Sequence, residues 1–341
     1  MNNLITDIDG LKVGNATDLT LKSGTTALLC DRPMIASCMI LGGAPGTRDT
    51  DLLSPEQSVQ HIDGLVLSGG SAYGLDAAGG VQAWLREQGR GFAIGPVRVP
   101  IVSSAILFDL INGGDKSWSR QSPYWELGWE AAEAAAQDFS LGSHGAGTGA
   151  FTAGLKGGLG SASMQTDDGI RIGALVAVNA VGRATMGETP HFWAAPFEKN
   201  AEFGGLGHAK ELPEDIAIPY TKLDAMRNAP TGGLPTGLGG NTTIGIIATD
   251  AKLTKPEAKR LAIMAHTGFA RALWPSHSPM DGDLIFALST GSKDLPNGDD
   301  GFGMLGAHGA ATMARAIARG VYEATPAPED PFPTWRAMFS S

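Results

Sequence analysis

Short runs of apolar and β-branched residues, most of them apolar at nearly every position, constrain the fold of this chain more than any other feature. A strand with one face in water alternates apolar and polar side chains, so a strand that is apolar throughout must be covered on both faces. The sequence therefore predicts strands buried between other layers, at residues 25–30, 35–41, 62–67, 170–179, 242–248 and 284–289.

Helical patterns lie between and after these runs. The clearest start signal is Thr254 with Glu257 three residues later, which forms a capping box, and Pro256 falls in the first turn of the same helix. Strands and helices mixed in this order favour a layered α/β or α+β architecture over a sandwich or a bundle. The predicted helices are residues 72–87, 104–111, 125–138, 255–273 and 306–324.

Glycine is the one compositional outlier, with 48 glycines in 341 residues. They gather at the ends of the apolar runs, which is typical of short loops between closely packed strands and helices. Two segments break the pattern. Residues 200–241 have few apolar runs and end in a glycine-rich stretch, which predicts a linker or exposed loop. Residues 325–341 are a proline-rich tail, predicted to be an extended arm or a segment that wraps a partner, outside a single domain of residues 1–324.

Charge and cysteine content exclude several classes of protein. With 35 acidic and 25 basic side chains the formal charge is −10, whereas a nucleic-acid binder usually carries a basic face. No apolar run approaches the ~20 residues of a membrane span. The first residues carry Asp7 and Asp9 and no basic stretch, which argues against a signal peptide. Cys30 and Cys38 are interpreted as reduced core residues, and a cytoplasmic location is expected.

The junction of Asn241 and Thr242 is the first candidate for chemistry. A glycine-rich loop passes there directly into an apolar strand that begins with a hydroxyl residue. Threonine becomes a nucleophile when a base takes its proton, and a free α-amine on the same residue can serve because its pKa is about 7.7–8.0. That amine exists only if the bond before Thr242 is cut. The alternative is a plain threonine at the start of a strand.

Asp281 and Asp283 come directly before another predicted strand, and alternation places both carboxylates on one face. Two neighbouring carboxylates at a buried edge need a cation, a metal ion, or hydroxyl and amine donors. An ammonium-bearing nucleophile would meet that need. A polar turn is the alternative, and a metal site is disfavoured because His277, the nearby histidine, has no register that aims it at the carboxylates.

Two further residues have the right chemistry. Lys156 stands among glycines, where its charge could lower the pKa of a neighbouring amine, and Asn179 ends an apolar run, where its amide could donate to an oxyanion. A solvated loop lysine and a turn cap are the alternatives. The glycine-rich loops at residues 68–71 and 145–149 match neither phosphate-binding fingerprint, so no nucleotide or other cofactor is expected.

Taken together, these stretches resemble the self-processing N-terminal-nucleophile amide hydrolases. That family includes L-aminopeptidase/D-esterase enzymes, β-peptidyl aminopeptidases and the 6-aminohexanoate-oligomer endohydrolase that degrades nylon oligomers. The order and spacing of the matching motifs run from Thr6 to about Ala324, and the motifs are residues 6–14, 67–75, 102–106 and 241–250.

The resemblance implies an α+β fold of four layers, helix, sheet, sheet and helix, and autocleavage between Asn241 and Thr242. The products would be residues 1–241 and 242–341, which stay associated. It further implies that Thr242 is the nucleophile, Lys156 the lysine beside it and Asn179 the oxyanion donor. Asp281 and Asp283 would be the pair that orients the threonine. Related enzymes form tetramers of processed pairs, so a homotetramer is expected.

Within this family the threonine and the Asp-x-Asp pair are closer to the nylon-oligomer branch than to the aminopeptidases, which tend to use serine with a Ser-x-Glu pair. Phe108, however, stands where the nylon-oligomer enzyme has a tyrosine, and a phenyl ring cannot donate a hydrogen bond. The expected substrate is therefore a small peptide or an ω-amino-acid oligomer. The rival hypothesis is a non-catalytic, glycine-rich binding or scaffold protein that keeps the fold.

Overall fold

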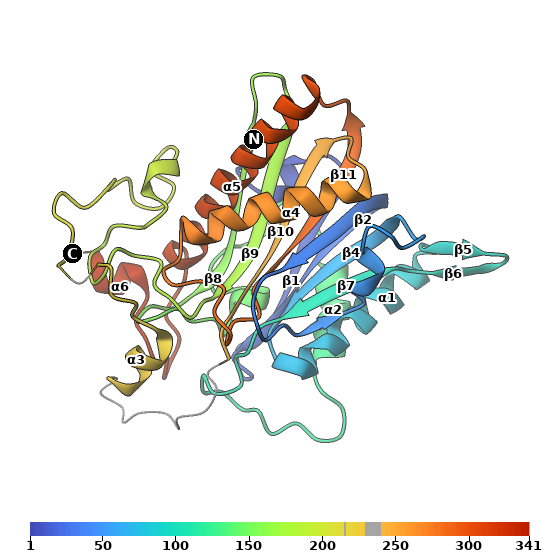
Figure 1. The fold of residues 1–341 in the computed structure, drawn as a ribbon. Coiled ribbons are helices and arrows are strands. Elements are labelled where there is room, and N and C mark those ends of the chain that lie inside the picture. The colour runs from blue at the N-terminus through green and yellow to red at the C-terminus, as the bar shows by residue number, and fades with distance from the viewer. Residues whose placement is uncertain (215, 229–239, 341) are drawn as a thin grey trace.

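A nine-stranded mixed sheet with helices on its outer faces makes up most of the computed structural model, which describes residues 1–214, 216–228 and 240–340 (Figure 1). The strand order is β3-β7-β4-β2-β11-β10-β9-β8, and β1 pairs with β2 off this path. A separate hairpin is formed by β5 and β6. The strands are β1 (Leu11–Asp18), β2 (Ser23–Ile40), β3 (Thr47–Arg48), β4 (His61–Ser68), β5 (Phe92–Ile94), β6 (Val97–Val99), β7 (Val102–Ile106), β8 (Gly158–Gln165), β9 (Arg171–Asn179), β10 (Thr242–Ala251) and β11 (Leu284–Lys293).

The long strand β2 joins the two halves of the sheet. Its first half pairs antiparallel with β1, its second half pairs antiparallel with β11, and β4 runs along the opposite edge. Because β1 and β11 share one edge of β2, the sheet divides there into two layers. The two strands predicted at residues 25–30 and 35–41 are therefore parts of one strand.

Alternating side chains of these strands build three separate cores. On β2, Leu28 and Cys30 point into the core between the two halves of the sheet, while Ala27 and Leu29 point toward α1 and α2. On β10, Ile246 joins the central core and Ile247 packs under α4 and α5. The layers are thus helix, sheet, sheet and helix. This confirms the predicted α+β class and explains why the strands are apolar at nearly every position.

Helices cover both outer faces, α1 with α2 on one and α4 with α5 on the other (Figure 1). The capping box predicted at Thr254 and Glu257 is present at the start of α4. The helix predicted to end at residue 138 stops earlier, because Ala136 exchanges backbone hydrogen bonds with Val13 of β1. The helices are α1 (Ala77–Glu87), α2 (Tyr124–Glu133), α3 (Lys222–Arg227), α4 (Lys255–Ala270), α5 (Gly298–Tyr322) and α6 (Trp335–Phe339).

The helix predicted at residues 104–111 is wrong, since residues 102–106 form strand β7. This strand runs parallel to β4, with Leu65 opposite Ser103 and Leu67 opposite Ala105. Serine and alanine have weak strand propensity, so here the hydrogen bonds of the neighbouring strand override the local preference. The strands β1 and β8, which are rich in small and polar residues, were not predicted from the sequence for the same reason.

The proline-rich tail folds back onto its own chain up to residue 340, the last that the structure describes. Phe332 packs edge-on against Phe151, and Trp335 stacks on Phe192 with ring centroids 5.7 Å apart. The indole N–H of Trp335 donates to the carbonyl of Pro190. An extended arm or a partner-wrapping segment would leave these aromatic groups exposed, whereas both Phe332 and Trp335 are buried.

Removing the Trp335 side chain should therefore destabilise the protein. Trp335→Ala leaves a cavity among aromatic rings, and we expect the free energy of unfolding to fall by about 3–5 kcal/mol in urea denaturation. Met338 lies in the same helix but is 47% exposed, so Met338→Ala should change the free energy of unfolding by less than about 1 kcal/mol. Equal effects of the two substitutions would contradict the docking of the tail.

Candidate active site

The start of β10 and the end of β9 place Thr242 beside Asn179. These strands are antiparallel neighbours, and their register pairs the two residues directly. Both side chains are buried, Thr242 to 4% and Asn179 to 2% exposure. Alternate side chains of these two strands fill two different cores, so a shift by one residue would exchange the side chains between the cores. The sheet therefore fixes this pair firmly.

The two aspartates reach the same point from the residues just before β11, the parallel neighbour of β10. Asp283 Oδ1 accepts the backbone N–H of Thr243 at 2.7 Å, and its Oδ2 accepts the backbone N–H of His277 and pairs with the ring Nδ1 of the same residue. The expectation that His277 is not aimed at the carboxylates is therefore wrong. Asp281 Oδ2 accepts the N–H of Ser278, while no hydrogen bond to Oδ1 is found among the described residues. Both carboxylates are buried to 1% exposure.

The carbonyl of Asn241 lies between two donors. The hydroxyl of Thr242 donates to this oxygen, and the backbone N–H of Gly282 donates to it at 3.0 Å. A Cβ on Gly282 would lie 2.8 Å from the Thr242 hydroxyl oxygen and 2.9 Å from the carbonyl oxygen of Ala44, so only glycine fits here. The hydroxyl and the carbonyl that precedes it are thus held together, with a second donor on the carbonyl oxygen.

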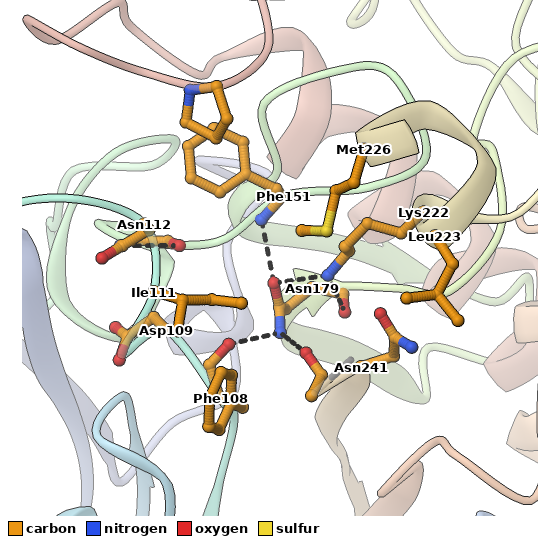
Figure 2. A pocket seen from close by; sticks show the side chains of 13 residues that line it. Phe108, Asp109, Ile111, Asn112, Phe151, Asn179, Lys222, Leu223, Met226 and Asn241 are labelled. Atoms are coloured by element: carbon orange, nitrogen blue, oxygen red, sulfur yellow. Dashed lines mark hydrogen bonds between the residues drawn. The ribbon is translucent and has the colours of Figure 1, made fainter. Parts of the chain in front are cut away.

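The amide of Asn179 is held at both ends (Figure 2). Its Oδ1 accepts the N–H of Phe151 at 3.0 Å and Nζ of Lys222 at 2.8 Å. Its Nδ2 donates to the carbonyl of Phe108 at 3.0 Å and to that of Gly240 at 3.1 Å. The two donors on Oδ1 leave Nδ2 as the group that faces the chain just before Thr242.

Lys222, the first residue of α3, is a site residue that the sequence analysis missed. Its side chain is buried, and burial lowers the pKa of the ammonium to about 7, although the carboxylates of Asp281 and Asp283 act in the opposite direction. The available signal was Thr221 with Asp224 three residues later, a capping box that starts α3. It lies in residues 200–241, which were interpreted as a loop. Most of the glycine-rich end of that segment falls outside the described residues.

Lys156, the lysine predicted beside Thr242, contacts the C-terminal tail. Its Nζ binds Oδ2 of Asp330 at 2.5 Å, and Lys22 binds the other carboxylate oxygen at 2.9 Å. Phe151 lies between Lys156 and Asn179: its backbone N–H binds the amide of Asn179, and its ring is 5.9 Å from the ammonium of Lys156. Among the predicted residues, the structure brings Thr242, Asn179, Asp281 and Asp283 together.

A narrow pocket opens beside this group (Figure 2). Its free volume is about 20 Å³, which is room for little more than one water molecule. Gly240 and Asn241 form part of its wall, so the chain that leads into Thr242 lies against the site. Its other lining residues include Phe108, Asn112, Phe151, Lys222, Leu223 and Met226.

No arrangement for a metal ion is found at this site or elsewhere in the part of the chain that the structure describes: no group of three or more His, Cys, Asp and Glu side chains could hold one. The helices in the same part of the chain include none that is both long and apolar enough to cross a membrane.

Comparison with solved structures identifies the fold. The chain is similar over 99% of its length to a β-aminopeptidase from Burkholderia sp., which it covers to 92% at 20% identity with a TM-score of 0.69. A similar match is the L-aminopeptidase D-Ala-esterase/amidase from Ochrobactrum anthropi, with a TM-score of 0.66, 20% identity and coverage of 97% and 90%. The latter is described as a new variant among the Ntn hydrolase fold, and the architecture found here is of that kind.

Sequence relatives define the family. An uncharacterised aminopeptidase of Mycobacterium tuberculosis is 39% identical over 355 residues, covering 99% of this chain and 98% of the relative. The 6-aminohexanoate-oligomer endohydrolase of Kocuria sp. is 28% identical over 297 residues, covering 85% and 76%. The model of peptidase family S58 matches residues 3–330. The chain therefore belongs to peptidase family S58, and a hydrolase of peptide-like bonds is the class that fold and family define.

The buried pair of carboxylates should make the stability of the protein depend on pH. Burial, followed by repulsion from Asp283, raises the pKa of Asp281 to about 6 from an ordinary value of 3.8. The folded protein thus holds this proton more tightly than the unfolded chain does, and the associated stability is present below about pH 3.8 and lost as the pH rises to about 6. Asp281→Asn cannot ionise. Its stability relative to wild type should therefore rise by about 1–3 kcal/mol between pH 4 and pH 7.

Asp283→Asn is the matched control, because Asp283 receives N–H donors on both oxygens and an amide would set its own N–H against one of them. This variant should be less stable than wild type at pH 7. Thermal unfolding of the three proteins between pH 4 and pH 8 gives the comparison. A difference between Asp281→Asn and wild type that does not change with pH would contradict the raised pKa.

Proposed function

We propose that the chain cleaves itself between Asn241 and Thr242, and that the freed N-terminal threonine then hydrolyses amide bonds of small peptides or ω-amino-acid oligomers. One observation carries this proposal: the hydroxyl of Thr242 donates to the carbonyl oxygen of Asn241, and Gly282 N–H donates to the same oxygen. A nucleophile is thus next to the carbonyl it would attack, and that carbonyl is already polarised.

In the intact chain the threonine oxygen attacks the carbonyl carbon of Asn241. The negative charge that develops on the carbonyl oxygen is stabilised by Gly282 N–H. The carbon–nitrogen bond then breaks, the hydroxyl proton passes to the departing nitrogen, and an ester joins Asn241 to the side chain of Thr242. Water hydrolyses this ester, which leaves a carboxylate on Asn241 and a free α-amine on Thr242.

In the processed enzyme that amine accepts the hydroxyl proton while the threonine oxygen attacks a substrate amide. Asn179 Nδ2, which meets the carbonyl of Gly240 in the intact chain, is the donor available to the substrate oxyanion. Asp283 holds the backbone N–H of Thr243 and so orients the start of β10. The amine product leaves with the proton, and water then releases the acyl group from the threonine.

The acyl side of the substrate would occupy the space that Gly240 and Asn241 occupy before cleavage. Phe108 limits this space, because a Cβ on Gly240 would lie 2.0 Å from the Phe108 side chain. An unbranched group therefore fits best at the position of Gly240. A small peptide and a linear ω-amino acid both meet this condition, which agrees with relatives named as aminopeptidases and as a 6-aminohexanoate-oligomer endohydrolase.

We also propose that the processed heterodimers assemble into a homotetramer and that the protein is located in the cytoplasm. Support for association comes from the β5–β6 hairpin, which projects from the main sheet (Figure 1). Apolar side chains on both of its strands are exposed. Exposed apolar groups gathered in this way are typical of a contact surface. They are Phe92, Ile94, Val97 and Val99.

Self-cleavage predicts two bands on a denaturing gel of purified protein, of about 25 and about 10 kDa from a chain of 35.2 kDa. N-terminal sequencing of the smaller band should begin at Thr242. Thr242→Ala removes the nucleophile and should give one uncut, inactive chain, whereas Thr242→Ser retains a hydroxyl and should still cleave. A wild-type chain that stays intact after prolonged incubation would instead favour a non-catalytic scaffold.

If Asn179 is the oxyanion donor, a substitution at this residue should lower kcat. Asn179→Asp keeps the size of the side chain and the acceptor that faces Phe151, but replaces the Nδ2 donor by an acceptor. We expect kcat for a short amide substrate to fall on the order of 10²–10³-fold. Products from a short peptide, a β-amino acid amide and a linear 6-aminohexanoate oligomer, identified by mass, give both the rates and the substrate class. A kcat within threefold of wild type would exclude Asn179 as the donor.

A further inference from the structure

A lysine that is fully inside the protein has an unusual set of partners at this site. Lys222 is 3% exposed, and its Nζ donates to two oxygens of one residue, the backbone carbonyl of Asn179 at 3.0 Å and the side-chain Oδ1 at 2.8 Å. Burying an ammonium costs several kcal/mol, and an apolar side chain of similar size would avoid this cost. Packing alone therefore does not account for a lysine here.

The chemistry of lysine decides how the amide of Asn179 lies. A protonated lysine is a donor only, so in that state the amide turns its oxygen toward Lys222. The N–H of Phe151 is a second donor on the same oxygen. With Oδ1 fixed by two donors, Nδ2 must point away from them, toward the carbonyl of Gly240 (Figure 2). Without Lys222, the observed orientation of the Asn179 amide would lose one of the hydrogen bonds that favour it over the flipped orientation.

The positive charge of Lys222 also affects the Asn179 amide. A positive group behind Oδ1 withdraws electron density from the amide and makes Nδ2 a stronger donor. The carboxylates of Asp281 and Asp283 act on Lys222 through space, so the lysine also offsets the negative charge of the pair that holds the start of β10. Lys156 is engaged with Asp330 of the tail, which leaves Lys222 as the lysine that contacts the catalytic group.

We propose that Lys222 is a positioning residue of the hydrolase: it fixes the amide of Asn179 in the donor orientation and supplies the positive charge behind it. This inference rests on the proposed function, because Asn179 is there the donor to the substrate oxyanion.

The test compares two buried lysines that start helices in the same way. Lys255 is the first residue of α4, follows a threonine capping box as Lys222 does, and is 1% exposed, but its Nζ donates to the carbonyls of Leu52 and Val59, which do not line the site. Lys222→Met and Lys255→Met each replace a buried ammonium by an apolar chain of similar length. Both should alter the thermal midpoint by similar amounts.

Only Lys222→Met should alter the chemistry. We expect kcat for a short amide substrate to fall on the order of 10–100-fold with KM within about twofold, because the donor acts in the transition state. Lys255→Met should retain the wild-type kcat. A kcat for Lys222→Met within twofold of wild type would overturn the proposal. If Lys222→Met does not fold, Lys222→Gln, which is uncharged and shorter but polar, is judged by the same limits.

A second measurement does not depend on activity. Crystal structures of Thr242→Ala and of Thr242→Ala with Lys222→Met show the site with the chain intact. We expect Nδ2 of Asn179 to bind Gly240 in the first and to leave that contact in the second. An Asn179 amide unmoved by the loss of Lys222 would refute the positioning role even if the chain never cleaves itself. An absence of cleavage in the wild type, with the amide displaced, would instead refute only the proposed function.

Discussion

The position of β10 between β9 and β11 is the constraint on which the rest of this site depends. Antiparallel pairing sets Thr242 opposite Asn179, and parallel pairing sets Ile244 opposite Leu284, one residue after Asp283. Three strands that are distant in the sequence therefore deliver their polar ends to one point. One side of each strand fills the central core and the other packs under α4 and α5, and a slip by one residue would exchange the side chains that fit these two cores.

The four layers account for the glycine content as well as for the apolar strands. Where the chain turns at the site, Gly282 must lack a side chain because a Cβ would approach the Thr242 hydroxyl oxygen to 2.8 Å. Where β8 meets α5, a Cβ on Gly160 would lie 1.8 Å from the carbonyl oxygen of Ala316. Glycine therefore permits backbones to approach closely both in the cores and beside the nucleophile, and the two uses cannot be told apart from composition.

Features that depend on periodicity could be predicted from the sequence, and features that depend on tertiary contacts could not. The strands that carry Thr242 and Asn179, and the strand that follows the aspartates, can be predicted from apolar runs. Strand β7 does not, because its serines are held by the ladder with β4. Lys222 was missed for a related reason: a short helix in a segment without apolar runs gives little signal, and its role depends on contacts with β9. Motif resemblance likewise indicates Lys156 as a site residue but not its pairing with Asp330, which comes from the tail.

The uncut chain has a consequence for when the site can act. Gly240 and Asn241 line the pocket, Asn179 Nδ2 donates to the carbonyl of Gly240, and the free volume of about 20 Å³ is room for little more than one water molecule. The donor that would serve a substrate is thus already occupied by the protein's own backbone, held at the length of a normal hydrogen bond. Under the proposed function, cutting the bond before Thr242 performs two tasks at once: it creates the amine that accepts the proton, and it permits the preceding segment to leave the acyl site. Activity before processing is then excluded by occupancy as well as by chemistry.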